Sequence, residues 1–146
     1  MDFTIAEILP HRPPMVMIDS ISEWDGESAR GVKVFREDDY ASSDAGLAEV
    51  ILIECLAQTV AAMSGLNARQ SGHPPGMGML VGVDHFEIHA PPVPQVETQL
   101  LIKVENRLGP FLLVHGKALQ KSEVIAEGNL KFYIEAADLI VSSRTL

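Results

Sequence analysis

A glutamate stands inside the most apolar stretch of this 146-residue chain, ILIECLAQTVAAMSG at 51–65. A buried carboxylate is costly unless it is paired, hydrogen-bonded or protonated. Glu54 is therefore either half of a structural ion pair or a working acid or base. Apolar surroundings keep a carboxyl group protonated, which suits a general acid. Gln58 lies one helical turn later on the same face, so it either orients Glu54 or satisfies backbone groups.

Five histidines are candidate partners for Glu54. His11 stands in ILPHRPPMVMIDSI, where three prolines stiffen the chain by fixing φ. A stiff loop holds an imidazole in place, although an ordinary turn histidine explains the residue as well. His73 lies in a Pro-rich turn typical of solvated side chains, and His115 is expected to be a packed or edge histidine within a strand.

A metal site is a second possibility for the histidines. His85, Glu87 and His89 alternate along an expected strand, so they would share one face and could chelate a metal. A solvent-facing polar edge explains the same spacing, and no other His or Cys cluster completes a site. We expect neither a metal nor another cofactor. Cys55, the lone cysteine, is expected to be a small buried thiol and fits a reducing cytoplasm.

Composition and charge narrow the class of protein. The chain is 47% hydrophobic and 21% charged, which is ordinary for a globular domain, and no signal-peptide pattern opens it. We expect a cytoplasmic protein. The net charge is −9 with scattered Lys and Arg, which argues against nucleic acid and favours a small-molecule or protein partner.

The apolar stretch from Leu47 to Leu66 is long enough to cross a bilayer, but polar residues interrupt it, each costly in lipid. We expect a buried helix here and no membrane span. The rest of the chain alternates as strands do, with predicted strands at 15–21, 29–35, 77–88, 97–105, 111–120 and 124–134. Weak helical spacing follows at 136–146. The pattern predicts a single α+β domain over 1–146, with an antiparallel sheet and one long helix.

One stripe of that helix combines polar and small residues. At helical spacing the stripe contains Leu47, Ile51, Glu54, Gln58, Ala61 and Gly65. Small residues after the polar pair leave room for something other than side chains. The stripe therefore predicts a cleft beside the helix.

Two motifs carry a resemblance to a known family. ILPHRPPMVMIDSI followed by ILIECLAQ resembles the hotdog-fold 3-hydroxyacyl-[acyl carrier protein] dehydratases. Later segments, MLVGVDHFEIHAPPVPQVETQLLIKVE and GKALQKSEVIAEGNLKF, look like that family's remaining strands. The resemblance implies a hotdog fold, in which a curved antiparallel sheet wraps around one central helix and dimers form by joining sheets.

The chain departs from the family's pattern at one place, and this changes which histidine is expected to be the catalytic base. The dehydratases usually carry a catalytic histidine in a Gly-His-Phe-Pro loop before the helix, whereas this chain has DDYASSDAGLAEV there. No histidine lies between His11 and His73, and only Gly46 matches the helix-start glycine. With LPHRPPMV and LAQTVAAMSG, the chain is most similar to the dehydratase-like proteins of aryl polyene gene clusters.

The resemblance implies a reaction and roles. A 3-hydroxyacyl thioester on acyl carrier protein would lose water to give the trans-2-enoyl thioester, in fatty acid or aryl polyene type biosynthesis. His11 would remove the proton from C2 and Glu54 would protonate the leaving hydroxyl on C3. Backbone N–H groups of Gly46 and Leu47, free at the helix N-terminus, would stabilise the thioester carbonyl.

Three other functions stay open. A hotdog thioesterase would use the helix carboxylate to activate water, a non-catalytic subunit would only bind the acyl carrier, and a metal enzyme would use the 85–89 cluster. Acyl carrier proteins are acidic, as this chain is, so docking needs a local basic patch, for which Arg12 and Arg69 are candidates. We expect a homodimer or an assembly of dimers, with a heterodimer also open.

Overall fold

In the computed structural model, the described residues are 3–37, 45–74 and 76–135. Their elements in chain order are α1 (Ile5–Ile8), β1 (Ser20–Trp24), β2 (Ser28–Val34), α2 (Ala45–Gln70), β3 (Gly78–Ile88), β4 (Glu97–Leu108), β5 (Phe111–Gln120) and β6 (Glu123–Ile134). The helical spacing at 136–146 lies outside the described residues.

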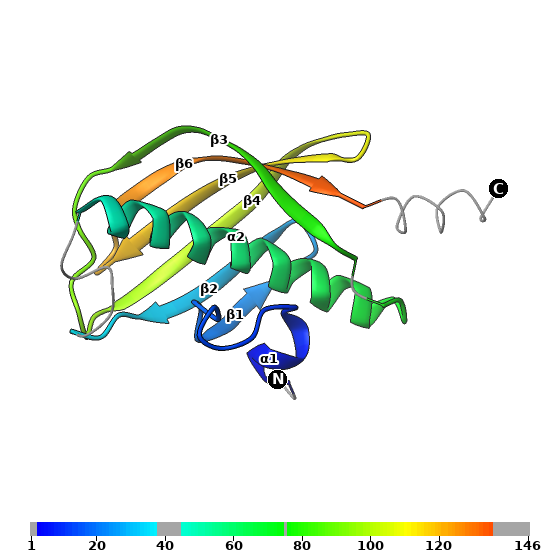
Figure 1. Cartoon of the computed structure of the whole chain (residues 1–146), viewed down its shortest axis with the longest axis horizontal. Helices are drawn as coiled ribbons and strands as arrows, with labels where there is room; N and C mark the ends of the chain where they lie inside the picture. Colours follow the sequence, from blue (N-terminus) through cyan, green and yellow to red (C-terminus); the bar gives the residue numbers. More distant parts are fainter. Residues whose placement is uncertain (1–2, 38–44, 75, 136–146) are drawn as a thin grey trace.

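The strands form one six-stranded sheet in the order β1-β2-β4-β5-β6-β3. Every pairing is antiparallel. The sheet curves around α2, and α1 lies beside the helix at the sheet's β1 end (Figure 1). This confirms the predicted α+β hotdog arrangement.

The core lies between the concave face of the sheet and α2. Along β5 every second residue is buried, and β4 shows the same alternation over most of its length. The helix contributes Leu52, Leu56 and Met63, all essentially inaccessible to solvent, and Cys55 is buried among them as predicted. Burying each large apolar side chain contributes about 1.5–3 kcal/mol, so this layer fixes the helix against the sheet.

Among the described strands, the first differs most from its prediction. The apolar run 15–21 predicts a strand there, but β1 spans Ser20–Trp24. The backbone N–H of Met17 and the C=O of Met15 bond to the side chain of Gln58 instead of to a neighbouring strand. Because the buried Gln58 amide forms the hydrogen bonds of this backbone segment, residues 15–17 run along the helix. Pairing of β1 with β2 begins only at Ser20.

The long helix resembles a membrane span only by composition. The segment Glu49–Gln70 is long and apolar enough to cross a bilayer, but 67% of an apolar 18-residue stretch within it is buried inside the fold. A helix that is apolar nearly all round and packed into a sheet is typical of a protein core. We interpret α2 as that core helix.

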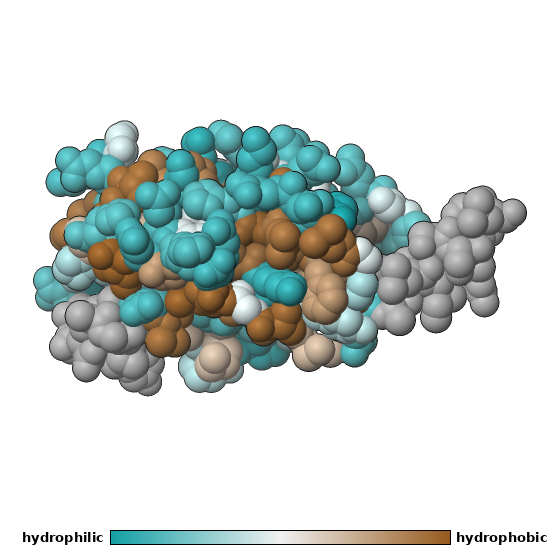
Figure 2. All heavy atoms as spheres, turned by 90° about the horizontal axis from the view of Figure 1, so that it is seen from above, coloured by the Kyte–Doolittle hydropathy of each residue, from teal (hydrophilic) through white to brown (hydrophobic). Residues whose placement is uncertain are grey.

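The β3 edge of the sheet carries exposed apolar side chains. Met79, Val81 and Val83 lie on this edge strand and are each about half exposed, and Met77 just before it is more exposed still. Figure 2, viewed from the side on which β3 lies, shows brown apolar surface between teal polar surface. A long edge strand of this kind is a ready pairing surface for another chain.

Candidate active site

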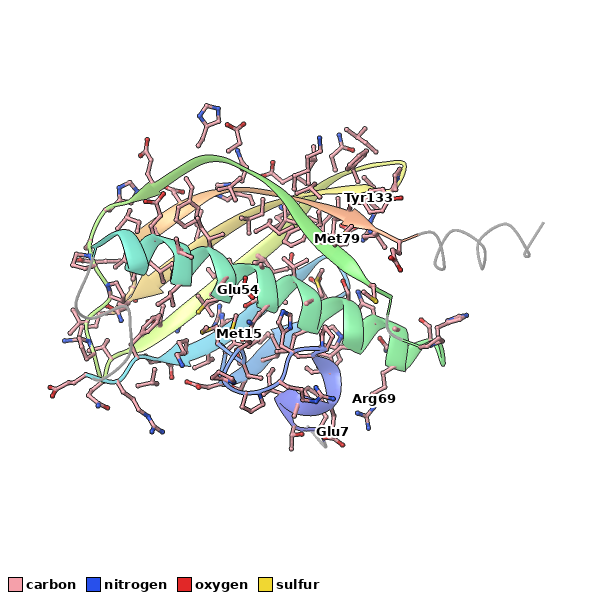
Figure 3. The ribbon with its side chains drawn as sticks, viewed as in Figure 1. Glu7, Met15, Glu54, Arg69, Met79 and Tyr133 are labelled. Atoms are coloured by element: carbon pink, nitrogen blue, oxygen red, sulfur yellow. The ribbon has the colours of Figure 1, made fainter. Side chains whose placement is uncertain are left out.

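Gln58 is the centre of the polar constellation on α2. Its side chain is fully buried, and its Oε1 accepts from the Met17 N–H at 2.8 Å. Its Nε2 donates to the Met15 carbonyl at 2.7 Å and to Glu54 Oε1 at 2.8 Å. The two roles left open for Gln58 are thus both present, because one amide fastens the 15–17 segment to the helix and orients Glu54. Figure 3 shows Glu54 beside the segment that carries Met15.

The structure brings His11 to Glu54. His11 Nε2 lies 3.6 Å from Glu54 Oε1, and the side chains are 29% and 32% exposed. The two residues are 43 positions apart in the sequence, so the loop between α1 and β1 supplies the imidazole and the third turn of α2 supplies the carboxylate. An imidazole and a carboxyl group at this separation can act on two neighbouring atoms of one substrate.

The surroundings of Glu54 differ from those predicted. We expected a carboxyl group enclosed in the apolar core, but about a third of the side chain is exposed. The helix faces the sheet with Leu52, Cys55 and Leu56, which are fully buried, so Glu54 lies on another side of the helix and opens into a pocket. The contacts of Glu54, and not its burial, therefore indicate what its carboxyl group can do.

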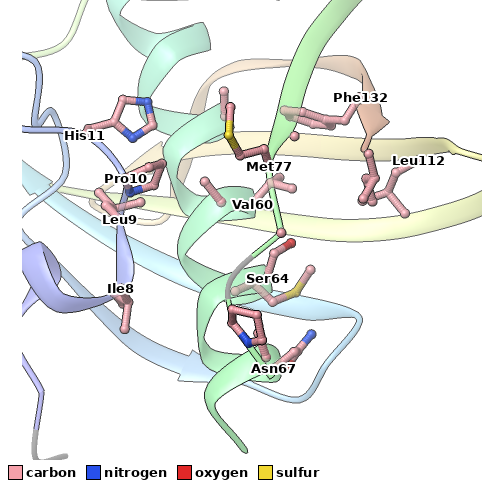
Figure 4. A pocket seen from close by; sticks show the side chains of 18 of the residues that line it. Ile8, Leu9, Pro10, His11, Val60, Ser64, Asn67, Met77, Leu112 and Phe132 are labelled. Carbon is pink, nitrogen blue, oxygen red and sulfur yellow. The ribbon is translucent and has the colours of Figure 1, made fainter. Parts of the chain in front are cut away.

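A pocket of about 710 Å³ extends from the His11–Glu54 pair along α2. It lies between the helix, the 6–12 segment and the start of β3 (Figure 4). Its apolar lining includes Leu9, Val60, Met63, Leu80, Leu112 and Phe132. A volume of this size accommodates an extended small molecule, and the lining suits an aliphatic or unsaturated chain.

The predicted cleft beside the helix is confirmed, with one change in how its small residues are used. Ala57 and Ala61 line the pocket, so their short side chains leave room in it. Gly65 serves another purpose, because a Cβ there would collide with the backbone carbonyl of Ile8. This glycine lets the end of α1 approach the helix closely, which places the loop carrying His11.

The predicted helix-start amides lie apart from this pair. Gly46 and Leu47 are in the first turn of α2, as expected. Gly46 precedes Glu54 by eight residues, which is about 12 Å along a helix. In a 3-hydroxyacyl group only two bonds, about 2.5 Å, separate the carbonyl carbon from C3. Within one chain, the structure does not bring these amides to the carbonyl of a substrate whose C3 hydroxyl contacts Glu54.

The short α1 helix that begins the loop has its own carboxylate. Glu7 accepts hydrogen bonds from the Thr4 backbone N–H and from the Thr4 hydroxyl, which together lower the pKa of the Glu7 carboxyl. This reciprocal capping fixes the first turn of α1. Since Glu7 also lines the pocket, it contributes a negative charge to the pocket's rim.

A profile of the ApeP-like family, described as ApeP dehydratase, matches residues 3–140. The chain belongs to this dehydratase family. The family assignment agrees with the predicted resemblance to hotdog dehydratases close to the aryl polyene branch.

Curated relatives of this ApeP-like chain cover nearly its whole length. It is 33% identical over 139 residues to the 3-hydroxyacyl-[acyl-carrier-protein] dehydratase FabZ of Herpetosiphon aurantiacus, covering 89% of this chain and 94% of the relative. It is 31% identical over 130 residues to the uncharacterised protein YcsD of Bacillus subtilis, covering 87% and 95%.

Solved structures share the fold. The dehydratase heterocomplex ApeI:P from Xenorhabdus doucetiae contains a chain with a TM-score of 0.81 and 18% identity, and the match covers 100% of both chains. Cj0977, a sigma28-regulated virulence protein of Campylobacter jejuni, matches with a TM-score of 0.65 and 13% identity, covering 90% and 95%.

The possible metal cluster at His85, Glu87 and His89 does not form in this ApeP-like chain. The ladder of β3 is irregular between Asp84 and Glu87, and His85 has a φ of 50°, so the side chains do not alternate regularly. His85 pairs with Asp84, whereas His89 pairs with Glu127 on β6. Over the described ranges, no three His, Cys, Asp or Glu side chains are arranged to hold a metal ion.

Sequence reasoning missed a second imidazole–carboxylate cluster, which involves β5, β6 and the end of β3. Glu127 lies 3.5 Å from His89 Nε2 and 3.6 Å from His115 Nε2. His115 Nδ1 is hydrogen-bonded to Asn129 Oδ1 at 2.9 Å. The partly exposed His115 is thus a paired strand histidine. Only the strand register could have revealed this cluster, because it places Asn129 opposite His115.

Proposed function

We propose that this protein dehydrates a 3-hydroxyacyl thioester carried on acyl carrier protein, giving the trans-2-enoyl thioester and water. The observation that carries the proposal is that His11 Nε2 faces Glu54 Oε1 across 3.6 Å at the edge of a largely apolar pocket. Membership of the ApeP-like dehydratase family and similarity to FabZ dehydratases support it. A role in fatty acid or aryl polyene type biosynthesis follows from the same similarity.

The two side chains divide the proton transfers. His11, with its imidazole neutral, takes the proton from C2, and the electron pair of that C–H bond forms the C2–C3 double bond. The C3–O bond breaks as Glu54 gives its proton to the hydroxyl, which leaves as water. The proton on His11 then passes to Glu54, directly or through a water molecule, which restores both groups for the next turnover.

The contacts of Glu54 indicate which oxygen gives the proton. Gln58 Nε2 donates to Glu54 Oε1, so that oxygen is an acceptor. In the acid form the transferable proton therefore lies on Oε2. Because Gln58 is itself held by the Met15 and Met17 backbone, it fixes the plane of the carboxyl group, and this orientation favours proton transfer in one direction.

The apolar part of the pocket suits the acyl group. With the hydroxyl at Glu54, the lining residues Val60, Met63 and Phe132 would contact hydrocarbon. Burial of each methylene contributes about 0.8 kcal/mol, so such a pocket favours longer acyl chains over short ones.

A partner subunit belongs to this proposal. We propose that the β3 edge, with its exposed Met79 and Val81, joins the sheet of a second hotdog chain, identical or different. The structural neighbour from Xenorhabdus doucetiae is part of a dehydratase heterocomplex, which favours testing an unlike partner. The acidic acyl carrier would then dock beside the pocket, in the cytoplasm.

The direct test is incubation with a 3-hydroxyacyl carrier protein, followed by mass spectrometry of the carrier. Loss of water is the expected result. Release of the free acid would show a thioesterase that uses Glu54 to activate water. A third result is that the protein by itself is inactive and that a second hotdog subunit with an intact site restores turnover. If inactivating Glu54 in this chain then leaves the restored rate unchanged, this chain is a non-catalytic subunit.

A further inference from the structure

We infer that Arg12 is a positioning residue that holds His11 in place for proton transfer. The inference rests on the proposed function of His11 as the base. Arg12 Nη1 donates to the carbonyl of His11 at 2.8 Å, to the carbonyl of Leu9 at 3.0 Å and, more weakly, to that of Ala6 at 3.4 Å. One guanidinium nitrogen therefore joins the end of α1 to the residue that carries the imidazole.

The ring of His11 depends on its backbone for its position. Its Nδ1 is buried, and among the described residues no atom forms a hydrogen bond with it. A histidine that acts as a base is usually oriented by a hydrogen bond at the nitrogen remote from the reaction. In this chain that bond is missing from the described contacts, so the backbone that Arg12 holds determines where Nε2 lies relative to Glu54.

The local sequence explains why an arginine is needed. Three prolines flank His11 and Arg12, and they have no N–H to donate to the carbonyls of this loop. Arginine remains charged at every physiological pH and presents several donors, so it can satisfy carbonyls that the prolines leave without partners. Hydrogen bonds from a charged donor are also stronger than neutral ones.

These contacts make carrier docking a secondary use of Arg12. We expected its charge to attract an acidic partner, but Nη1 is bonded to the loop itself. A docking residue should affect carrier-bound substrates more than soluble ones. A positioning residue should affect both equally, because each reaches the same imidazole.

The test compares Arg12→Gln and Arg12→Lys with a charge control. Lys121, exposed in the turn between β5 and β6, is replaced in Lys121→Gln. We expect Arg12→Gln to lower kcat by about 10- to 100-fold with KM changed less than about threefold, since a displacement of about 1 Å has effects of this size. The loss should be equal for a carrier-bound substrate and its soluble pantetheine thioester. Arg12→Lys, which keeps a charged donor, should recover most of kcat.

A readout independent of turnover is the NMR signal of the His11 ring in the ligand-free protein. It should shift or broaden in Arg12→Gln and remain near its wild-type position in Arg12→Lys and Lys121→Gln. The ring signal tests the positioning of His11 separately from the proposed function. If the wild-type protein had no dehydratase activity, the proposed function would be wrong, but the ring signal would still show whether Arg12 holds His11.

Two results would overturn the inference. One is an unchanged ring signal in Arg12→Gln with activity lost only on the carrier-bound substrate, which would assign Arg12 to docking. The other is a displaced ring with full kcat in either variant. If Arg12→Gln does not fold, Arg12→Lys supplies the second comparison, because a displaced ring with wild-type kcat there has the same meaning.

Discussion

Two imidazole–carboxylate pairs in this protein have nearly the same geometry in different surroundings. His11 lies 3.6 Å from Glu54, and His115 lies 3.6 Å from Glu127. Even the exposure is similar, 29% for both histidines and 32% against 38% for the two glutamates. Distance and accessibility therefore do not distinguish a candidate site from a surface cluster.

What differs is the space that each pair faces and the way each histidine is held. The His11 pair faces a pocket lined largely by apolar side chains, whereas His115 borders a cavity on the outer face of the sheet lined mostly by polar and charged ones. His115 is anchored through Nδ1 by Asn129, on a strand whose place the ladder fixes. Apolar side chains beside a substrate strengthen electrostatic effects on it, which favours the pair that faces the pocket along α2 as the candidate site.

The largest difference is expected between Glu54→Gln and Glu127→Gln. Glutamine keeps the shape of Glu54 and still accepts a hydrogen bond from Gln58, but it has no transferable proton. Dehydration should fall by about 10²- to 10⁴-fold, the usual contribution of a positioned acid or base. Glu127→Gln should leave the rate within about twofold. The measurement is the initial rate on a 3-hydroxyacyl carrier protein, with circular dichroism to check folding.

Two results for Glu54→Gln would contradict the role of Glu54 as an acid. A folded Glu54→Gln protein with an unchanged rate would leave the binding-subunit function as the better one. A Glu54→Gln protein destabilised by about 3–5 kcal/mol would show a structural ion pair instead of an acid.

The histidines should show a similar contrast. His11→Ala should reduce dehydration about as much as Glu54→Gln does, and the double variant should be little worse than either single one, because the two groups act in one step. His115→Ala should keep its rate per folded molecule. Single-turnover rates measure this contrast, and a folded, fully active His11→Ala protein would rule out the pair as the catalytic groups.

A smaller effect, on stability, is expected from Gln58→Leu compared with Asn129→Leu. Loss of the Gln58 amide leaves the Met17 N–H and the Met15 carbonyl without their partners, at about 1–3 kcal/mol for each such group. Asn129 is partly exposed, so water can replace it and the cost should be below about 1 kcal/mol. Urea unfolding gives both free energies, and equal values would contradict the role assigned to Gln58.

The smallest effect concerns the outer cavity, where Asp25 serves folding. The N–H groups of Glu27 and Ser28 donate to Asp25 Oδ1 and lower the pKa of this carboxyl below its ordinary 3.8. With a lowered folded-state pKa, ionised Asp25 stabilises the fold above about pH 3.8, and this contribution is lost as the pH falls through the folded-state value. Asp25→Ala should therefore lower Tm at pH 7, with a gap from wild type that narrows as the pH falls below 3.8 and through the lowered folded-state pKa. Thermal unfolding at several pH values measures the gap, and a gap that widens in acid would contradict this account.

The spacing of apolar and polar residues was sufficient to predict most of the strands and the long helix, because that spacing depends on the geometry of each strand or helix by itself. The alternation of apolar residues predicted β5 at its observed bounds and β4 to within three residues of its end. The spacing of Glu54 and Gln58 predicted their contact, since residues four apart on a helix are neighbours whatever surrounds them. The motif LPHRPPMV with LAQTVAAMSG likewise predicted the family that the match over residues 3–140 shows.

Local patterns failed where a distant side chain replaced a backbone partner. The run 15–21 has the composition of a strand, yet Gln58 satisfies the backbone at Met15 and Met17, so the strand begins at Ser20. The alternation of His85, Glu87 and His89 was interrupted by an irregularity in β3 that the residue types do not reveal. In both places the backbone departs from a regular strand ladder. Which groups the backbone bonds to depends on what the tertiary structure brings close to it, and the local sequence does not show this.

The sequence by itself determined which chemical groups are available: one carboxyl group among apolar helix residues, a glutamine one turn later, and an imidazole in a proline-stiffened loop. Only the tertiary structure decided their use. It brought His11 to Glu54, opened Glu54 to a pocket, turned Arg12 onto its own loop and set Gly46 about two helical turns away. The physical reason is that spacing along a chain fixes contacts within one helix or strand, whereas contacts between elements depend on how the whole core packs.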